Sequence, residues 1–351
     1  SAKSASAAAP LAVHIPGAFG EEELAAVRRV EKRMLEEYGA GVAEHRSFGA
    51  GGGSQTVLFL HPYMDSVASF LRSKLQALVQ QADETAGWAV VRGASLRARC
   101  AELILYRAGN NISGDGDGKI GWHTDGVTLV TMAVMLSEEG SFQGGAIRLH
   151  APGHTEYENH TLSKAGDAIA WRGWTDHNVQ KIWQGKREVF VSEWWLGPDM
   201  TESDVPRHKD LPELTEQALQ LDASSPMLHY LHARALCTRL PCLDSPTAQA
   251  AEASFLRALE MAPREEKVSK SLGYFLLGGS WSQWARGVSL LRGVCVEQAA
   301  KEASELTTEP MVWGPLRWSG GATCWLHALQ TSVTAFAKRV MRARRGAAGG
   351  G

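Results

Sequence analysis

Two kinds of hydrophobic periodicity divide the chain. In its first part, apolar residues recur every three or four positions, which is typical of one face of an amphipathic helix. The first such stretch opens with glutamates at 21–23, which complement the positive end of a helix dipole, and it ends near Gly39. In the second stretch, Asp65 is the predicted N-cap. Its apolar positions are Val67, Phe70, Leu71, Leu75, Leu78 and Val79.

From about residue 95 the pattern changes to short runs of β-branched, aliphatic and aromatic residues, separated by Gly, Asn, Asp or Pro. Several short strands at this spacing predict a sandwich or barrel and not alternating strand–helix units. The chain up to about residue 199 is therefore predicted to be an α+β domain, in which two helices lead into an all-β core. The predicted strands are 103–106, 129–136, 146–150, 168–171 and 188–196.

Beyond Pro198 and Pro206 the chain is rich in Ala, Leu and Glu, and it repeats itself at an offset of 40 residues, with Ala218-Leu219 matched by Ala258-Leu259. Ala251, Phe255, Ala258 and Pro263 have the spacing of helix B in a tetratricopeptide repeat. The region resembles that repeat, stretched from roughly 34 residues by the insertion at 240–245. An ordinary helical bundle is the alternative.

Four segments follow from these patterns. We predict a flexible leader at 1–9, an α+β domain at 10–199, a tetratricopeptide-like helical domain at 207–340 and a disordered tail at 341–351. The length of 351 residues, about twice that of a usual domain, also favours two domains.

The composition is that of a globular protein. With 44% hydrophobic and 21% charged residues, a mainly disordered, collagen-like or coiled-coil chain is excluded. The formal net charge of −2 provides no overall field toward nucleic acid or an anionic membrane, so neither is expected as a partner. No run reaches the roughly 18 apolar residues that a membrane span needs.

Five cysteines without close spacing argue against a disulfide framework or a zinc ribbon, and they favour a reducing compartment. The chain opens with Ser1, and 1–9 show no signal-peptide pattern, although a signal removed upstream would not be visible. We therefore expect a soluble protein, with the cytoplasm favoured and the compartment left open.

The segment 121–126, Gly-Trp-His-Thr-Asp-Gly, carries the clearest chemistry. His123 and Asp125 are two positions apart, so on an extended segment both side chains point to the same face. A second histidine, His177, follows the predicted strand at 168–171. Two imidazoles and one carboxylate are the facial triad of non-haem iron(II) oxygenases, which leaves the remaining metal positions open.

Arg187 strengthens this interpretation, because it stands ten residues after His177 at the start of the last predicted strand. A guanidinium there can bind a carboxylate with two parallel hydrogen bonds, which lysine does less well. The alternative is a solvated charge, since the neighbouring Lys186 shows that basic residues are ordinary at this point. For the triad, the alternatives are an Asx turn at Asp125 and a core role for His177, with His160 as its nearest competitor.

In their order, the motifs between residues 11 and 195 resemble an iron(II)- and 2-oxoglutarate-dependent dioxygenase of the prolyl 4-hydroxylase catalytic-domain type. Residues 14–19, His-Ile-Pro-Gly-Ala-Phe, resemble the family's N-terminal start. The other matching motifs are Tyr106 with 107–110, the H-x-D of His123 and Asp125, the hairpin at 135–145 that ends in Phe-Gln-Gly-Gly, the Gly-Asp-Ala turn at 166–168, and His177-x-Val followed by Gly-x-Arg at 185–187.

The resemblance implies a double-stranded β-helix, or jelly roll, with iron(II) bound by His123, Asp125 and His177. It also implies that Arg187 binds the distal carboxylate of 2-oxoglutarate, with Tyr106 as a second donor. The implied reaction uses O2, converts 2-oxoglutarate to succinate and CO2, and hydroxylates an unactivated C–H bond. L-ascorbate is the implied reductant that keeps the iron in the iron(II) state.

Two features depart from the family pattern. The insertion at 113–118, Ser-Gly-Asp-Gly-Asp-Gly, lengthens the loop before the predicted metal ligands. Collagen-type members carry lysine where Arg187 stands, so the match is closer to the broader family. The Asp115-Gly-Asp117-Gly sequence lacks the later glutamate of an EF-hand, so a calcium loop is not expected.

Three functions are consistent with these features. The first is an active oxygenase whose substrate is a peptide or protein segment, such as a prolyl peptide, or alternatively a small molecule. The second is a tetratricopeptide-type scaffold that binds a protein partner and carries an inactive oxygenase fold. The third, a jelly-roll metal isomerase or sugar-binding module, would not require Arg187.

Overall fold

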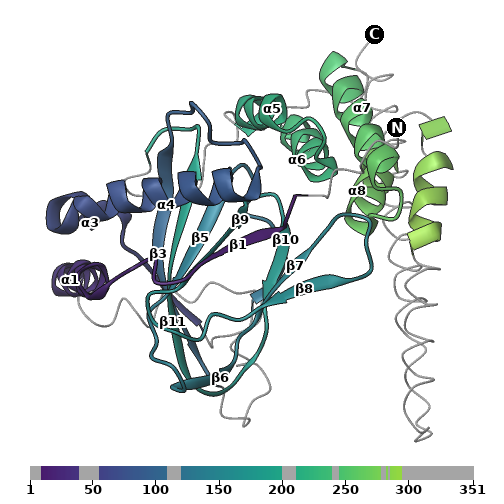
Figure 1. The fold of residues 1–351 in the computed structure, drawn as a ribbon. Helices are drawn as coiled ribbons and strands as arrows, with labels where there is room; N and C mark the ends of the chain where they lie inside the picture. Colours follow the sequence, from purple (N-terminus) through teal and green to yellow (C-terminus); the bar gives the residue numbers. More distant parts are fainter. Residues whose placement is uncertain are drawn as a thin grey trace, which may run out of the picture. The chain divides into compact units, whose positions relative to one another are not determined.

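The computed structural model describes residues 9–38, 55–108, 120–199, 211–238, 245–277, 282–283 and 285–294. The chain forms two compact units, Ser1–Ala223 and Ser224–Gly351, which are described separately (Figure 1). The insertions at 113–118 and 240–244, the predicted tail and most of the predicted leader lie outside the described residues.

The N-terminal helices of the first unit agree in part with the prediction. Helix α1 (Glu21–Tyr38) has the predicted start and end. The second stretch forms two helices, α3 (His61–Ala68) and α4 (Phe70–Ala86). The prediction of Asp65 as an N-cap was wrong: the helix begins earlier because Pro62 suits its first turn, and the Asp65 carboxylate instead pairs with Arg72 at 2.8 Å.

The strands form two antiparallel sheets (Figure 1). The large sheet has the order β1-β9-β5-β11-β3-β2, and β6 also pairs with β11. Its strands are β1 (Ala12–Ile15), β2 (Gln55–Phe59), β3 (Arg97–Arg107), β5 (Val130–Met135), β6 (Phe142–Gly144), β9 (Ala168–Arg172) and β11 (Ile182–Trp195). The small sheet has the order β4-β10-β7-β8. Its strands are β4 (Ile120–His123), β7 (Ile147–His150), β8 (Tyr157–His160) and β10 (Asp176–Val179).

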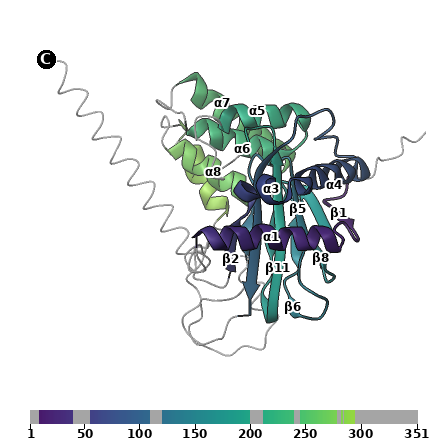
Figure 2. The same ribbon diagram turned by 90° about the vertical axis from the view of Figure 1, so that its left-hand side faces the viewer.

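One hydrophobic core lies between the two sheets. It joins residues of the large sheet, such as Ile104, Met135 and Ile169, to Leu149 and Val179 of the small sheet. The opposite face of the large sheet is covered by helices α1 and α4, which cross it in Figure 2. The predicted class, mixed helices and antiparallel strands, is confirmed for this unit.

The first unit extends further than the predicted domain. Helix α5 (Leu211–Leu221) belongs to it, although the sequence pattern grouped this helix with the helical region. A long-range ion pair that no local pattern reveals connects this region to the sheet: Arg172 on β9 contacts Asp222, directly after α5, at 3.0 Å.

The described part of the second unit is helical, with α6 (Pro226–Cys237), α7 (Pro246–Met261) and α8 (Glu266–Leu277). Helices α6 and α7 begin in the same way, because Ser225 and Ser245 each accept a hydrogen bond from the backbone N–H three residues later, ahead of a proline at the helix start. Ala251, Phe255 and Ala258 form the buried side of α7. The tetratricopeptide resemblance itself stays a prediction.

In the described parts of the chain, no helix is both long enough and apolar enough to cross a bilayer. Cys100 and Cys237, the two cysteines within these parts, are not in disulfides.

Candidate metal centre

Strand pairing brings two histidines together. His123 at the end of β4 lies directly opposite His177 on β10, so both side chains leave the small sheet on the same side. Their ring centroids are 4.2 Å apart. Two histidines that are 54 positions apart in the sequence therefore become neighbours through one antiparallel pair.

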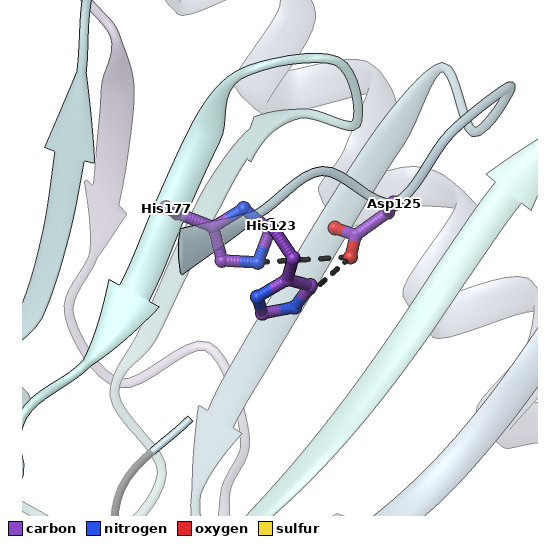
Figure 3. Close-up of side chains that lie close together, drawn as sticks. All are labelled: His123, Asp125 and His177. Carbon is purple, nitrogen blue, oxygen red and sulfur yellow. Dashed lines mark ion pairs between the residues drawn. The ribbon is translucent and has the colours of Figure 1, made fainter. Parts of the chain in front are cut away.

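Asp125 completes the group from the turn that follows β4. Its Oδ1 lies 3.7 Å from Nε2 of His123 and 3.6 Å from Nε2 of His177 (Figure 3). Because β4 ends at His123, Asp125 does not lie on an extended segment, as the H-x-D spacing had suggested. Its position is fixed instead by its own N–H, which donates to the Gly173 carbonyl at 2.8 Å.

Gly173 is required at this point because of a close backbone approach. A Cβ at residue 173 would collide with the carbonyl oxygen of Thr128. Any larger residue would push the two turns apart and move the carbonyl that holds Asp125. This glycine was not singled out in the sequence, because the contact joins two turns that are far apart in the chain.

Backbone carbonyls determine which imidazole nitrogen faces Asp125. Nδ1 of His123 lies 2.8 Å from the Gly121 carbonyl, and Nδ1 of His177 lies 3.0 Å from the Thr175 carbonyl. A carbonyl can only accept, so each neutral ring must carry its proton on Nδ1 and present an unprotonated Nε2. Both lone pairs are thus directed to the side of Asp125.

Burial differs among the three side chains. Those of His177 and Asp125 are 5% and 9% exposed, whereas that of His123 is 39% exposed. Burial lowers the pKa of His177, although the nearby Asp125 carboxylate opposes this effect. The His177 ring is therefore neutral at ordinary pH, as a metal ligand must be, and the site opens to solvent on the His123 side.

This donor set suits a divalent transition metal. The three donor atoms lie within 4.8 Å of one another, and atoms held about 2.1 Å from one ion are about 3 to 4 Å apart. Two neutral imidazoles and one carboxylate favour iron(II), with open positions for further ligands. The predicted residues His123, Asp125 and His177 are thus brought together, while the competitor His160 lies on β8 and contacts His14 at 3.0 Å.

Arg187 and Tyr106, the other two predicted site residues, lie next to each other. They are direct neighbours on β11 and β3, and the Arg187 guanidinium carbon lies 5.1 Å from the centre of the Tyr106 ring. Arg187 is 1% exposed, and its Nε and Nη1 have no hydrogen-bond partner in the described part of the protein. Burial lowers the pKa of Arg187, and burial raises the pKa of Tyr106 to about 12, so the phenol keeps its proton.

The backbone leaves room for this guanidinium at Gly145. A Cβ there would collide with the Ile182 side chain and lie 2.8 Å from Cδ of Arg187, and the residue has a φ of +72°. Only glycine adopts this conformation without strain while also making that space. An uncompensated buried cation is costly, so the site favours an anionic ligand.

A second group of possible ligands is less suited to a metal. Cys100, Glu102 and Glu193 have donor atoms within 4.8 Å of one another. The Glu193 carboxylate, however, forms an ion pair with Arg99 and accepts a 2.8 Å hydrogen bond from Thr128. A metal here would have to displace an existing ion pair, which the His123, Asp125 and His177 group does not require.

Comparisons with known proteins give only distant likenesses. No family model and no curated protein matches the chain. One similar solved structure is an oxidoreductase of the 2OG-Fe(II) oxygenase family from Burkholderia pseudomallei, with 14% identity over 52% of this chain and 84% of that chain, and a TM-score of 0.36. Another is a prolyl hydroxylase from Trichoplax adhaerens in complex with a hypoxia inducible factor peptide fragment, with 12% identity, 53% and 84% coverage, and a TM-score of 0.37.

A third similar structure is HygX from Streptomyces hygroscopicus with nickel and 2-oxoglutarate bound. It is 15% identical over 53% of this chain and 83% of that chain, with a TM-score of 0.37. At such identities and TM-scores the likenesses are too distant to decide the chemistry, which rests on the residues of this chain.

Proposed function

We propose that the chain is an iron(II)- and 2-oxoglutarate-dependent oxygenase with a jelly-roll core. His123, Asp125 and His177 hold the iron, while Arg187 and Tyr106 bind 2-oxoglutarate. The observation that carries the proposal is the buried Arg187 guanidinium, of which two nitrogens have no hydrogen-bond partner among the described residues. A structural or sugar-binding metal site has no need for such a group, whereas a dicarboxylate co-substrate supplies the missing acceptors.

Bound iron(II) would supply the oxygen chemistry: 2-oxoglutarate, O2 and R–H give succinate, CO2 and R–OH, with one oxygen atom in succinate and the other in the product. The residues of the chain have separate tasks in this reaction. Asp125 provides the single negative charge of the ligand set, and the two histidines provide neutral nitrogens. Arg187 provides a fixed cation in a site of low dielectric, where its attraction for a carboxylate is strong.

Tyr106 acts beside Arg187 as a donor. Because its pKa is raised to about 12, its hydroxyl stays protonated at any ordinary pH and can donate to the same carboxylate. Its ring also lies against the guanidinium, which favours the cation. This pair therefore selects a ligand with a terminal carboxylate and positions it.

For the substrate, we propose a peptide or protein segment, such as a prolyl peptide, with a small molecule as the alternative. The partly exposed His123 leaves the metal accessible from one side. The tetratricopeptide-like helices would recruit such a protein partner, because stacked helix pairs form concave surfaces suited to peptides. L-ascorbate would keep the iron reduced between turnovers.

The test uses the full-length protein under anaerobic conditions. Addition of 2-oxoglutarate to the iron(II)-loaded protein should produce a visible charge-transfer band, and oxygen should then yield succinate. A band without succinate would favour the alternative of a binding scaffold with an inactive oxygenase fold. Absence of the band would contradict 2-oxoglutarate binding and favour a metal isomerase or sugar-binding module.

A further inference from the structure

The indole of Trp171 lies beside the candidate metal ligands. Trp171 stands on β9, is 4% exposed and belongs to the core between the two sheets. Its ring centroid is 4.9 Å from that of His177. Directly opposite Trp171 on β5 is Thr131, whose hydroxyl donates to Asp125. The indole therefore contacts the candidate ligand His177 directly. It is connected to the second candidate ligand, Asp125, through Thr131 on the neighbouring strand β5.

The Nε1–H group of Trp171 has no acceptor among the residues that the structure describes. Leaving such a buried donor unpaired costs about 1–3 kcal/mol. Other buried indoles of the same unit do find acceptors: Trp88 donates to the Pro10 carbonyl, Trp194 to the Ser192 hydroxyl and Trp195 to the Pro198 carbonyl. Trp174 also has an Nε1 without an acceptor among the described residues, and its ring centroid lies 6.0 Å from the Arg172 guanidinium carbon.

The core between the sheets thus contains unpaired donors at two places. Arg187 supplies Nε and Nη1 beside Tyr106, which belongs to this core, and Trp171 supplies Nε1 on a ring that packs against the His177 ring. Donors at two separate points call for a ligand with acceptors at two separate points. A dicarboxylate such as 2-oxoglutarate has oxygen acceptors at both ends, whereas a monocarboxylate would satisfy only one of the two.

We infer that Trp171 is a positioning residue for the co-substrate: its Nε1–H donates a hydrogen bond to an oxygen at the end of 2-oxoglutarate that faces the three ligands, while Arg187 holds the other end. This inference rests on the proposed function and adds a specific donor to it. Through its ring contact, the same side chain also limits rotation of the His177 imidazole.

The first test is the substitution Trp171→Phe, which keeps an aromatic ring and removes the N–H. Titration of 2-oxoglutarate into the zinc(II)-loaded protein, which cannot turn over, should show about 10- to 100-fold weaker binding, the value of one hydrogen bond to a charged group. Zinc(II) affinity should remain unchanged. The matched control is Trp194→Phe, because that indole already donates within the protein, and its loss should leave 2-oxoglutarate affinity unchanged.

The second test follows the indole directly in the wild-type protein. In protein with 15N-labelled tryptophan indoles and bound zinc(II), we expect the Trp171 resonance to broaden strongly when manganese(II) replaces zinc(II), because its ring lies 4.9 Å from that of His177. Its absence from the Trp171→Phe spectrum assigns this resonance. Addition of 2-oxoglutarate should move this Nε1–H resonance downfield, as expected for a new hydrogen bond.

The outcomes separate the inference from the proposed function. If 2-oxoglutarate binds but the Trp171 resonance stays in place and Trp171→Phe binds as tightly as the wild type, the inference is wrong and the proposed function stands. If 2-oxoglutarate fails to bind the wild-type protein, the proposed function is wrong, and the inference fails with it.

Discussion

The hydroxyl of Thr131 donates a 2.6 Å hydrogen bond to Oδ2 of Asp125. Since this oxygen is occupied, Oδ1 remains to face Nε2 of both histidines. Thr131 is fully buried and paired on both sides within the large sheet, so it holds the carboxylate in one orientation. The metal site therefore depends on a residue that would not itself touch the metal.

Thr131→Val keeps the shape of the side chain but removes this donor. The Asp125 carboxylate is then free to rotate, and we expect metal affinity to fall about 10- to 100-fold, as is usual for an outer partner of a ligand. Iron(II) or cobalt(II) titration measures this change. Thr128→Val is the control, because the Thr128 hydroxyl donates to Glu193 instead. Equal losses in both variants would contradict the assigned role of Thr131.

Loss of a metal ligand should have a larger effect. His123→Ala, His177→Ala and Asp125→Ala are each expected to reduce iron(II) affinity by more than the roughly hundredfold upper limit for outer partners and to abolish succinate formation. Circular dichroism should show an intact fold. His160→Ala is the matched control, since this histidine lies at the far edge strand of the small sheet and contacts His14. Normal iron binding in any of the three variants would exclude that residue as a ligand.

Arg187→Met should leave the ligand-free protein at least as stable as the wild type, but it should weaken the binding of 2-oxoglutarate. Without ligand, the variant loses a buried charge that has no ion-pair partner within the described residues, so its free energy of unfolding should equal or exceed that of the wild type. With ligand, 2-oxoglutarate binding should weaken about 10- to 100-fold through loss of a charged contact. Thermal melts with and without 2-oxoglutarate measure both effects.

The control for this prediction is Arg99→Met. Arg99 is also largely buried, but it forms an ion pair with Glu193. Its removal should destabilise the ligand-free protein by about 3–5 kcal/mol, because it leaves a buried carboxylate without its partner. If Arg187→Met were destabilised to the same degree, Arg187 would have a structural ion-pair role and not a ligand-binding role.

Tyr106 should be visible in an alkaline titration. Its pKa is raised to about 12 by burial, whereas an unfolded chain loses this proton near pH 10. Its contribution to stability is therefore fully present below about pH 10 and declines between pH 10 and 12. Tyrosinate absorption should show a late step near pH 12 that is missing in Tyr106→Phe and retained in Tyr157→Phe. A late step that persists in Tyr106→Phe would contradict this assignment.

The sequence was sufficient to predict the parts of the fold that have local patterns. The amphipathic repeat predicted α1, and short runs of β-branched, aliphatic and aromatic residues predicted the central strands β3, β5, β9 and β11. The edge strands β1 and β2 were missed because they pair with distant parts of the chain: Ala12 lies opposite Trp171, and Thr56 opposite Leu105. Such pairing depends on tertiary contacts and not on local composition.

In the candidate site, too, some residues could be predicted from the sequence and others could not. The residues with distinctive chemistry, His123, Asp125 and His177, could be selected from spacing and from the family resemblance. Thr131 and Trp171 could not, because a threonine or a tryptophan on a strand is most often a core residue. Their roles come from which strands become neighbours, and so they appear only in the folded structure.

The most direct test of the account is an experimental structure of the full chain with iron(II) and 2-oxoglutarate, prepared without oxygen. We expect one metal about 2.1 Å from Nε2 of His123, Nε2 of His177 and Oδ1 of Asp125, and a carboxylate of 2-oxoglutarate on Nε and Nη1 of Arg187. A metal at Cys100, Glu102 and Glu193, or 2-oxoglutarate bound away from Arg187, would contradict the account.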